Sequence, residues 1–130
     1  MRILADTNLF VKFCRRLPLP KAVLSAFEDE GNELCLASIS AMEIYRLWQL
    51  GKIPDNPDSW LDLALPSWII IPMTIPIARQ AVLWNWDHRD PADRIIAATA
   101  SIEKLELWHT DTVLKSITGF PHQYFKNILE

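Results

Sequence analysis

Five acidic residues in this 130-residue chain lie where predicted strands end or predicted helices begin: Asp6, Glu43, Asp90, Asp93 and Asp111. Carboxylate oxygens are the ligands that Mg²⁺ and Mn²⁺ prefer in proteins, whereas Zn²⁺ prefers nitrogen and sulfur. If these acids converge, a bound divalent cation would offset their mutual repulsion. A cation held in this way can activate water for attack on a phosphodiester and stabilise the charge that develops.

Each acid also fits a structural role, because acidic side chains commonly cap helices. Ser40 and Glu43 have the spacing of a capping box, and Asp90 precedes a proline that suits the first helical position. Two acids nevertheless share a helical stripe with apolar residues, Glu43 with Leu47 and Asp93 with Ile96. Their carboxylates are therefore expected to lie over apolar surface, where an unpaired charge is costly.

Four short apolar runs predict the strands that would position these acids, at residues 2–5, 34–37, 68–71 and 105–108. Helical patterns separate the runs, with predicted helix starts near Pro20, Ser40, Asp58, Ala78 and Pro91 and a short helix near 113–117. This alternation predicts an α/β domain with a central parallel sheet of four to five strands and helices on both faces. A fifth strand within 123–129 has the weakest pattern. The carboxyl ends of parallel strands meet at one edge, so the acids are expected there.

The composition excludes several classes of protein. Three glycines cannot supply a dinucleotide fingerprint or a phosphate-binding P-loop. Two cysteines form neither a disulfide framework nor a metal motif, and His88, His109 and His122 offer no pair at helical i, i+4 spacing. No apolar run is long enough to span a membrane, so we expect a cytoplasmic protein of one domain, residues 1–130.

The motifs resemble those of the PIN domain family, and within it the VapC-type toxins of bacterial toxin–antitoxin pairs. The matching segments are collinear along the chain: Asp6-Thr7-Asn8 after the first strand, Ser40-Ala41-Met42-Glu43, the block from Asp90 to Ala100, and Asp111 after a late strand. The resemblance implies a Mg²⁺-dependent endoribonuclease, with Mn²⁺ as a possible substitute, whose metal-binding and catalytic acids are Asp6, Glu43, Asp93 and Asp111.

The same resemblance implies a supporting set of residues, which is Thr7, Asn8, Asp90 and Thr110. It also implies a small VapB-like antitoxin as partner, and a homodimer. One position departs from the family pattern, because His109 stands where relatives often have a threonine two residues before the last acid, and Thr110 follows it.

Positive charge gathers in residues 12–21, which carry four basic side chains and no acid in a chain of net charge −3. Lys12, Arg15 and Arg16 could guide an RNA backbone toward the acids, with Arg94 closer in; the alternative is a solvated helix end. Trp84, Trp86 and Trp108 could stack on bases or pack in the core. An apolar groove for an amphipathic antitoxin segment is predicted among helices that carry Leu24, Phe27, Tyr45, Trp48 and Trp60.

Two other functions are compatible with a small acidic α/β domain. One is a PIN-like module that binds RNA or protein without catalysis. The other is a Mg²⁺-binding phospho-accepting signalling domain, which would need an Asp at the end of its central strand and a Lys after its last. The run 68–71 is followed by Pro72 and not by an acid, and no Lys directly follows 105–108, which disfavours the signalling domain.

Overall fold

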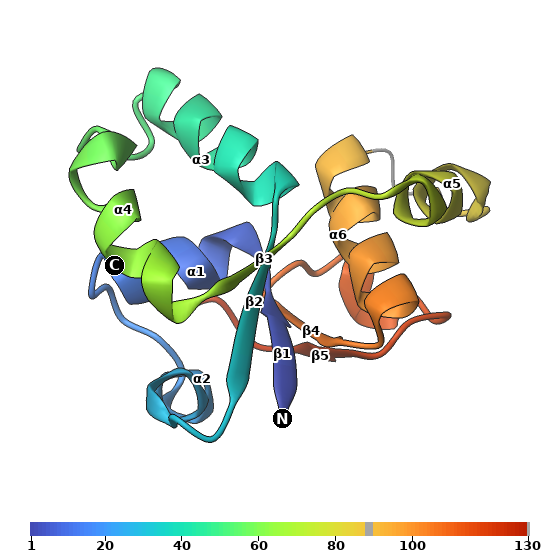
Figure 1. Ribbon diagram of the computed structural model, residues 1–130, viewed down its shortest axis with the longest axis horizontal. Helices are drawn as coiled ribbons and strands as arrows, with labels where there is room; N and C mark the ends of the chain where they lie inside the picture. The colour runs from blue at the N-terminus through green and yellow to red at the C-terminus, as the bar shows by residue number, and fades with distance from the viewer. Residues whose placement is uncertain (88–89, 130) are drawn as a thin grey trace.

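The computed structural model describes residues 1–87 and 90–129, and His88 lies outside them. Five parallel strands form one sheet in the order β3-β2-β1-β4-β5 (Figure 1). Their bounds are β1 Arg2–Ala5, β2 Glu33–Ala37, β3 Ile69–Ile71, β4 Glu106–His109 and β5 His122–Tyr124. The helices are α1 Thr7–Cys14, α2 Lys21–Glu28, α3 Ile39–Gln49, α4 Leu61–Ala64, α5 Ile75–Leu83 and α6 Pro91–Glu103.

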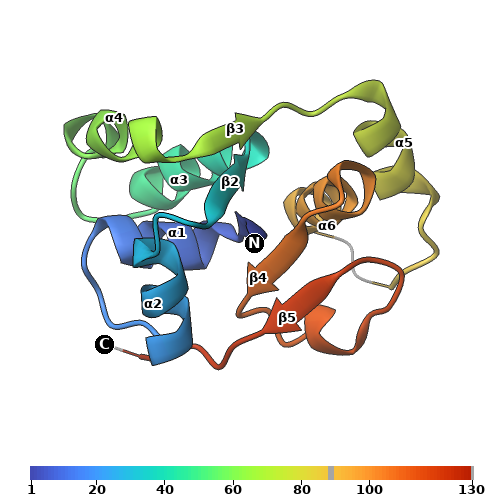
Figure 2. The same cartoon turned by 60° about the horizontal axis from the view of Figure 1, so that its bottom comes forward.

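The sheet is covered on both faces, as the apolar runs predicted, because successive side chains of a strand point to opposite faces. In β1, Ile3 and Ala5 pack with residues of α1, α2 and α4, whereas Leu4 packs with residues of α6. Figures 1 and 2 show α1, α2 and α4 grouped on one side of the strands and α5 and α6 on the other. The predicted α/β class is therefore confirmed.

Some elements differ from the sequence prediction. The helix expected from Asp58 to about Leu65 is instead a 3₁₀ turn at Pro57–Ser59, the four-residue α4 and a second 3₁₀ turn. The apolar strand β3 is not buried; it lies at the sheet edge, where Ile69 and Ile70 are exposed. A fifth strand is present but lies earlier than the predicted 123–129: it spans His122–Tyr124, where His122 pairs with Leu107 of β4, and residues 125–129 are not in a strand. No helix in the described part of the chain is long and apolar enough to cross a membrane.

The topology brings the acids to one edge. Asp6 directly follows β1 and Asp111 follows β4, and these two strands are neighbours in the sheet. Helix α6 leads into β4, which runs parallel to β1, so α6 runs back across the sheet and its first residues start near the carboxyl edge. Asp90 is its N-cap and accepts from the backbone N–H of Ala92 at 3.0 Å.

Candidate active site

Asp6 lies in the site and links the end of β1 to the end of β4. It is the N-cap of α1, where its Oδ1 accepts a hydrogen bond from the backbone N–H of Leu9 at 2.8 Å. Its Oδ2 accepts from the backbone N–H of Thr110 at 3.1 Å. The capping role predicted for Asp6 is therefore real, and it orients the carboxylate beside the other acids without using all of its lone pairs.

Glu43 is held by a hydroxyl and not by a capping box. Helix α3 begins one residue before Ser40 and its N-cap is Ser38, so the predicted start of this helix at Ser40 was wrong. Ser40 is fully buried in the first turn, and its hydroxyl accepts from Thr7 Oγ1 at 2.9 Å. The same Thr7 hydroxyl lies 2.5 Å from Oε1 of Glu43. A single hydroxyl proton can serve only one of these acceptors at a time, and both contacts place Thr7 between α1 and α3.

The tightest group of carboxylates joins α3 to the start of α6. One carboxylate oxygen from each of Glu43, Asp90 and Asp93 lies within 4.8 Å of the others. Asp90, which the sequence placed only in a supporting role, is thus a member of the cluster. Its charge also raises the pKa of Glu43, although burial is the larger cause and the hydrogen bond from Thr7 acts in the opposite direction.

Asp6 and Asp111 lie in the same hollow as Glu43 and Asp93, all four lining a pocket of about 400 Å³. The pKa of Asp6 is raised from 3.8 to about 6, mainly by burial and to a smaller extent by the charges of Glu43 and Asp111, against the two backbone hydrogen bonds. The four acids that the resemblance assigned as metal ligands are therefore gathered at one place. Asp111 itself caps a turn, accepting from the backbone N–H of Val113 at 2.8 Å.

Asn8 and Thr110 line the same pocket and connect α1 to the segment after β4. Asn8 Nδ2 donates to Thr110 Oγ1 at 2.8 Å and to Asn127 Oδ1 at 3.1 Å. The C-terminal segment continues along α1, where the ammonium of Lys12 donates to the carbonyl of Ile128. These contacts hold residues 125–129 beside the pocket.

The donor set fits a hard divalent cation. All of its ligand atoms are oxygens, and the carboxylates come from four separate segments of the chain. Three of these carboxylates, those of Glu43, Asp90 and Asp93, are close enough to share one ion. A cation bound there would also remove the repulsion that raises the pKa of Asp6, so binding and deprotonation would favour each other.

Only some of the basic residues that were predicted to contact RNA lie at the acid pocket. Lys12 and Arg15 line the acid pocket; Lys12 is buried, and Arg15 lies 3.5 Å from Asp55. Lys52, which sequence reasoning missed, lines the same wall. It directly follows Gly51, whose positive φ of 76° ends α3 and turns the chain back toward the pocket. The sequence feature that could have indicated Lys52 is the glycine directly before this basic residue.

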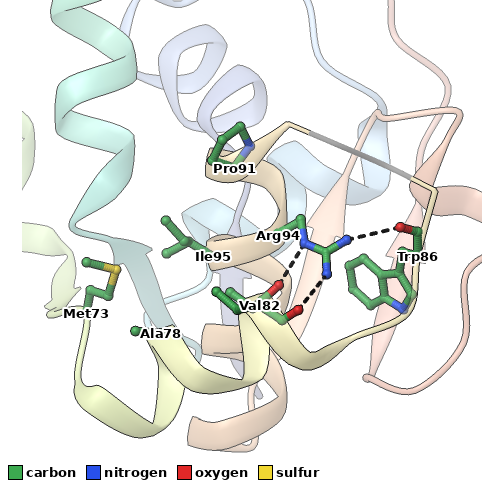
Figure 3. A pocket seen from close by; sticks show the side chains of 8 residues that line it. Met73, Ala78, Val82, Trp86, Pro91, Arg94 and Ile95 are labelled. Atoms are coloured by element: carbon green, nitrogen blue, oxygen red, sulfur yellow. Dashed lines mark hydrogen bonds between the residues drawn. The ribbon is translucent and has the colours of Figure 1, made fainter.

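Arg16 and Arg94 lie elsewhere. Arg16 lines a groove between α1, α2 and α4 and does not line the acid pocket. Arg94 Nε donates to the carbonyl of Ala81 at 2.7 Å, and its terminal nitrogens reach the carbonyl of Trp86 at 3.3 Å and that of Trp84. Figure 3 shows the guanidinium between Val82 and the ring of Trp86, at the wall of an apolar pocket of about 450 Å³. These contacts fasten the end of α5 to α6.

The histidines form a pair that helical spacing could not reveal. His109 ends β4 and is completely buried, and His122 begins β5, the neighbouring strand. Their Nε2 and Nδ1 atoms are 2.9 Å apart. Burial lowers the pKa of His109 to about 4, with a smaller contribution from His122, so His109 is neutral at physiological pH. Two strands in parallel register bring these distant residues together.

Comparison with known proteins agrees with this geometry. The PIN domain family model matches residues 3–119. Among solved structures, VapBC2 from Rickettsia felis bound to a promoter DNA fragment gives a TM-score of 0.77 at 18% identity, covering 97% of this chain and 100% of that one. DNA-bound VapBC from Salmonella typhimurium gives 0.72 at 16%, covering 95% and 98%. A toxin–antitoxin complex from Klebsiella pneumoniae gives 0.64 at 22%, covering 88% and 92%.

No curated protein matches the sequence with comparable significance. The solved structures share the fold at low identity, whereas the family model covers nearly the whole chain and includes all five acids of the pocket and its rim. On that match, together with the parallel five-stranded sheet that gathers those acids, this chain belongs to the PIN domain family.

Proposed function

We propose that this protein is a Mg²⁺-dependent endoribonuclease and the toxin of a VapBC-type toxin–antitoxin pair. The observation that carries the proposal is the cluster of Glu43, Asp90 and Asp93, with oxygens within 4.8 Å of one another, in continuity with Asp6 and Asp111. Carboxylates gathered in this way repel one another, and a bound cation offsets that repulsion. PIN domains are generally nucleases, and an all-oxygen acidic cluster supports the proposal that the metal binds here.

In this proposal Asp6, Glu43, Asp93 and Asp111 hold the ion, and Asp90 adds a further carboxylate within 4.8 Å of those of Glu43 and Asp93. When bound, Mg²⁺ supplies polarised water and stabilises the negative charge on the phosphate. Thr7 keeps the Glu43 carboxylate turned toward α1, and Asn8 and Thr110 fix the segment that carries Asp111. Lys12, Arg15 and Lys52 line the same pocket as the acids, and their positive charge favours a polyanionic substrate.

The partner part of the proposal rests on the groove between α1, α2 and α4. This groove has a volume of about 710 Å³, and its lining includes Leu24, Trp60 and Leu63, of which Leu63 is 84% exposed. A small amphipathic helix from an antitoxin would cover that apolar surface. The similar solved structures are toxin–antitoxin complexes, which supports the same partner class. We also propose a homodimer, formed by the exposed apolar face of α5, and a cytoplasmic location.

The test is cleavage of RNA by the purified protein. With Mg²⁺ or Mn²⁺ the wild-type chain should cut a quenched fluorescent RNA and should fail in EDTA. Asp93→Asn should lose cleavage while keeping the fold, because a carboxylate of the metal cluster becomes a neutral amide. Asp62→Asn, an exposed acid on α4, is the matched control and should remain active. Full activity of Asp93→Asn would refute the site assignment.

The alternative of a PIN-like module that binds without catalysis makes a different prediction. Such a module would bind RNA or the partner in EDTA and release no cleaved product with either metal. The partner test is to search for a short open reading frame beside the gene and to co-express its product, which should inhibit cleavage if it is the antitoxin.

A further inference from the structure

The buried pair His109–His122 touches the segment that carries Asp111, and neither histidine lines the acid pocket. The backbone N–H of Asp111 donates to Nδ1 of His109 at 3.2 Å. A nitrogen that accepts a hydrogen bond has no proton of its own, so the neutral ring of His109 carries its proton on Nε2. The tautomer of His109 is thereby determined.

The tautomer of His109 determines the tautomer of His122. Nε2–H of His109 points at Nδ1 of His122, 2.9 Å away, so Nδ1 of His122 is the acceptor. The proton of His122 is then on Nε2, which lies 2.6 Å from the carbonyl oxygen of Ile117. The result is a hydrogen-bond chain with one direction, from the Asp111 backbone through two imidazoles to the Ile117 carbonyl.

Aromatic contacts surround the two rings. The rings of His109 and His122 lie 5.1 Å apart at 29°, and Phe120 stacks on His122 at 4.4 Å and 24°. On the other side of the same loop, Asp6 accepts from the backbone N–H of Thr110. The backbone N–H groups of Thr110 and Asp111 are therefore both held by hydrogen bonds, the first to Asp6 and the second to His109.

We propose that His109, oriented by His122, is a positioning residue for Asp111, setting the backbone from which that carboxylate reaches the metal. This inference rests on the proposed metal site. The ring of His109 reaches the backbone of Asp111 and is itself oriented from β5 by His122. Groups outside the ligand set that orient ligands commonly change metal affinity by 10–100-fold when altered.

The decisive variant is His122→Leu, which leaves the pocket lining and His109 unchanged. Without an acceptor, the buried Nε2–H of His109 has no partner, and the ring loses the hydrogen bond from β5 that orients its Nδ1 toward the N–H of Asp111. His122→Asn is the conservative variant, because its side-chain oxygen can take the place of Nδ1 as acceptor.

The measurement is Mg²⁺ affinity by calorimetry on the full chain, with the Mg²⁺ concentration for half-maximal RNA cleavage as a second readout. His122→Leu should weaken Mg²⁺ binding about 10-fold, and His122→Asn should restore most of the loss. The matched control is Phe120→Leu, which removes packing on His122 but leaves the hydrogen bonds; it should lower the melting temperature without changing Mg²⁺ affinity. Equal Mg²⁺ affinity in His122→Leu and wild type would overturn the inference.

Nitrogen-15 NMR of the wild-type imidazoles tests the chain itself and does not depend on any variant folding. His109 should carry its proton on Nε2 and accept at Nδ1, and a proton on Nδ1 of His109 would overturn the inference. A wild-type protein that binds no Mg²⁺ would overturn the proposed function as well, which distinguishes the two failures.

Discussion

Replacing Asp6 by asparagine should make the metal-free protein more stable at neutral pH. Burial raises the pKa of Asp6 from 3.8 to about 6, and one pKa unit corresponds to about 1.4 kcal/mol. The ionised carboxylate therefore destabilises the folded state by about 3 kcal/mol at pH 7. An asparagine has nearly the same shape and no charge, so it removes this penalty.

The gain is smaller than the full penalty because asparagine has one acceptor oxygen where aspartate has two. Asp6 accepts from the N–H groups of Leu9 and Thr110 with different oxygens, and the amide of asparagine would oppose one of them. Losing that hydrogen bond costs about 1 kcal/mol. The net gain is then about 2 kcal/mol, which raises Tm by roughly 6–10 °C in a chain of this size.

The direction of this pKa shift determines how the stability difference between the two proteins changes with pH. Since the folded-state pKa of Asp6 lies above the unfolded value, its protonation stabilises the wild type fully below pH 3.8, and this stabilisation is lost as the pH rises through about 6. The advantage of Asp6→Asn should therefore be large at pH 7.5 and nearly absent at pH 4.5. Urea unfolding in EDTA at both pH values measures it, with the exposed Asp62→Asn as control.

Mg²⁺ should reduce or reverse the difference between the two proteins. At 100 times its dissociation constant, a ligand that binds only the folded state stabilises it by about 2.7 kcal/mol, and only the wild type retains the full set of carboxylates. An Asp6→Asn protein that is no more stable than wild type in EDTA at pH 7.5, or equally stabilised at both pH values, would refute the reasoning.

Three further predictions concern the surroundings of the site. Arg15→Ala should weaken RNA binding and flatten its salt dependence because Arg15 lines the acid pocket, whereas Arg16→Ala should keep the wild-type slope; anisotropy titrations at several salt concentrations would contradict this if both slopes fell equally. Leu24→Glu should reduce the affinity of the antitoxin by placing a charge in the α1–α4 groove, measured by calorimetry at low and high Mg²⁺ with matched ionic strength; unchanged affinity would place the antitoxin elsewhere. Arg94→Lys should lower the unfolding free energy by about 1–3 kcal/mol, because an ammonium cannot reproduce the planar fork that reaches the carbonyls of Ala81, Trp84 and Trp86; an unchanged denaturation midpoint would show that those contacts contribute nothing.

The part of the fold that sequence could predict is the part that local pattern determines. The apolar run 2–5 followed by Asp6, and Asp90-Pro91 at the start of a helix, were interpreted correctly because an N-cap acid and a proline act within one turn. The convergence of the acids then followed from parallel strands having a common carboxyl edge.

What the sequence could not predict depends on contacts between distant segments. The capping box at Ser40 was plausible locally, but Thr7 from another helix binds both Ser40 and Glu43 instead. His109 and His122 are brought together by strand register, which no spacing rule within one helix can detect. Lys52 reaches the pocket only because α3 ends where it does.

The position of the two chain ends has a practical consequence for making and studying this protein. The amino group of Met1 binds Asn32 at the start of β1 and β2, at the other end of the strands from Asp6. The last described residues instead run along α1, tied to Asn8 and Lys12 at the pocket (Figure 1). A purification tag or fluorescent protein joined after these residues would emerge beside the acid pocket and restrict access to it, whereas one joined before Met1 would lie at the other end of the strands.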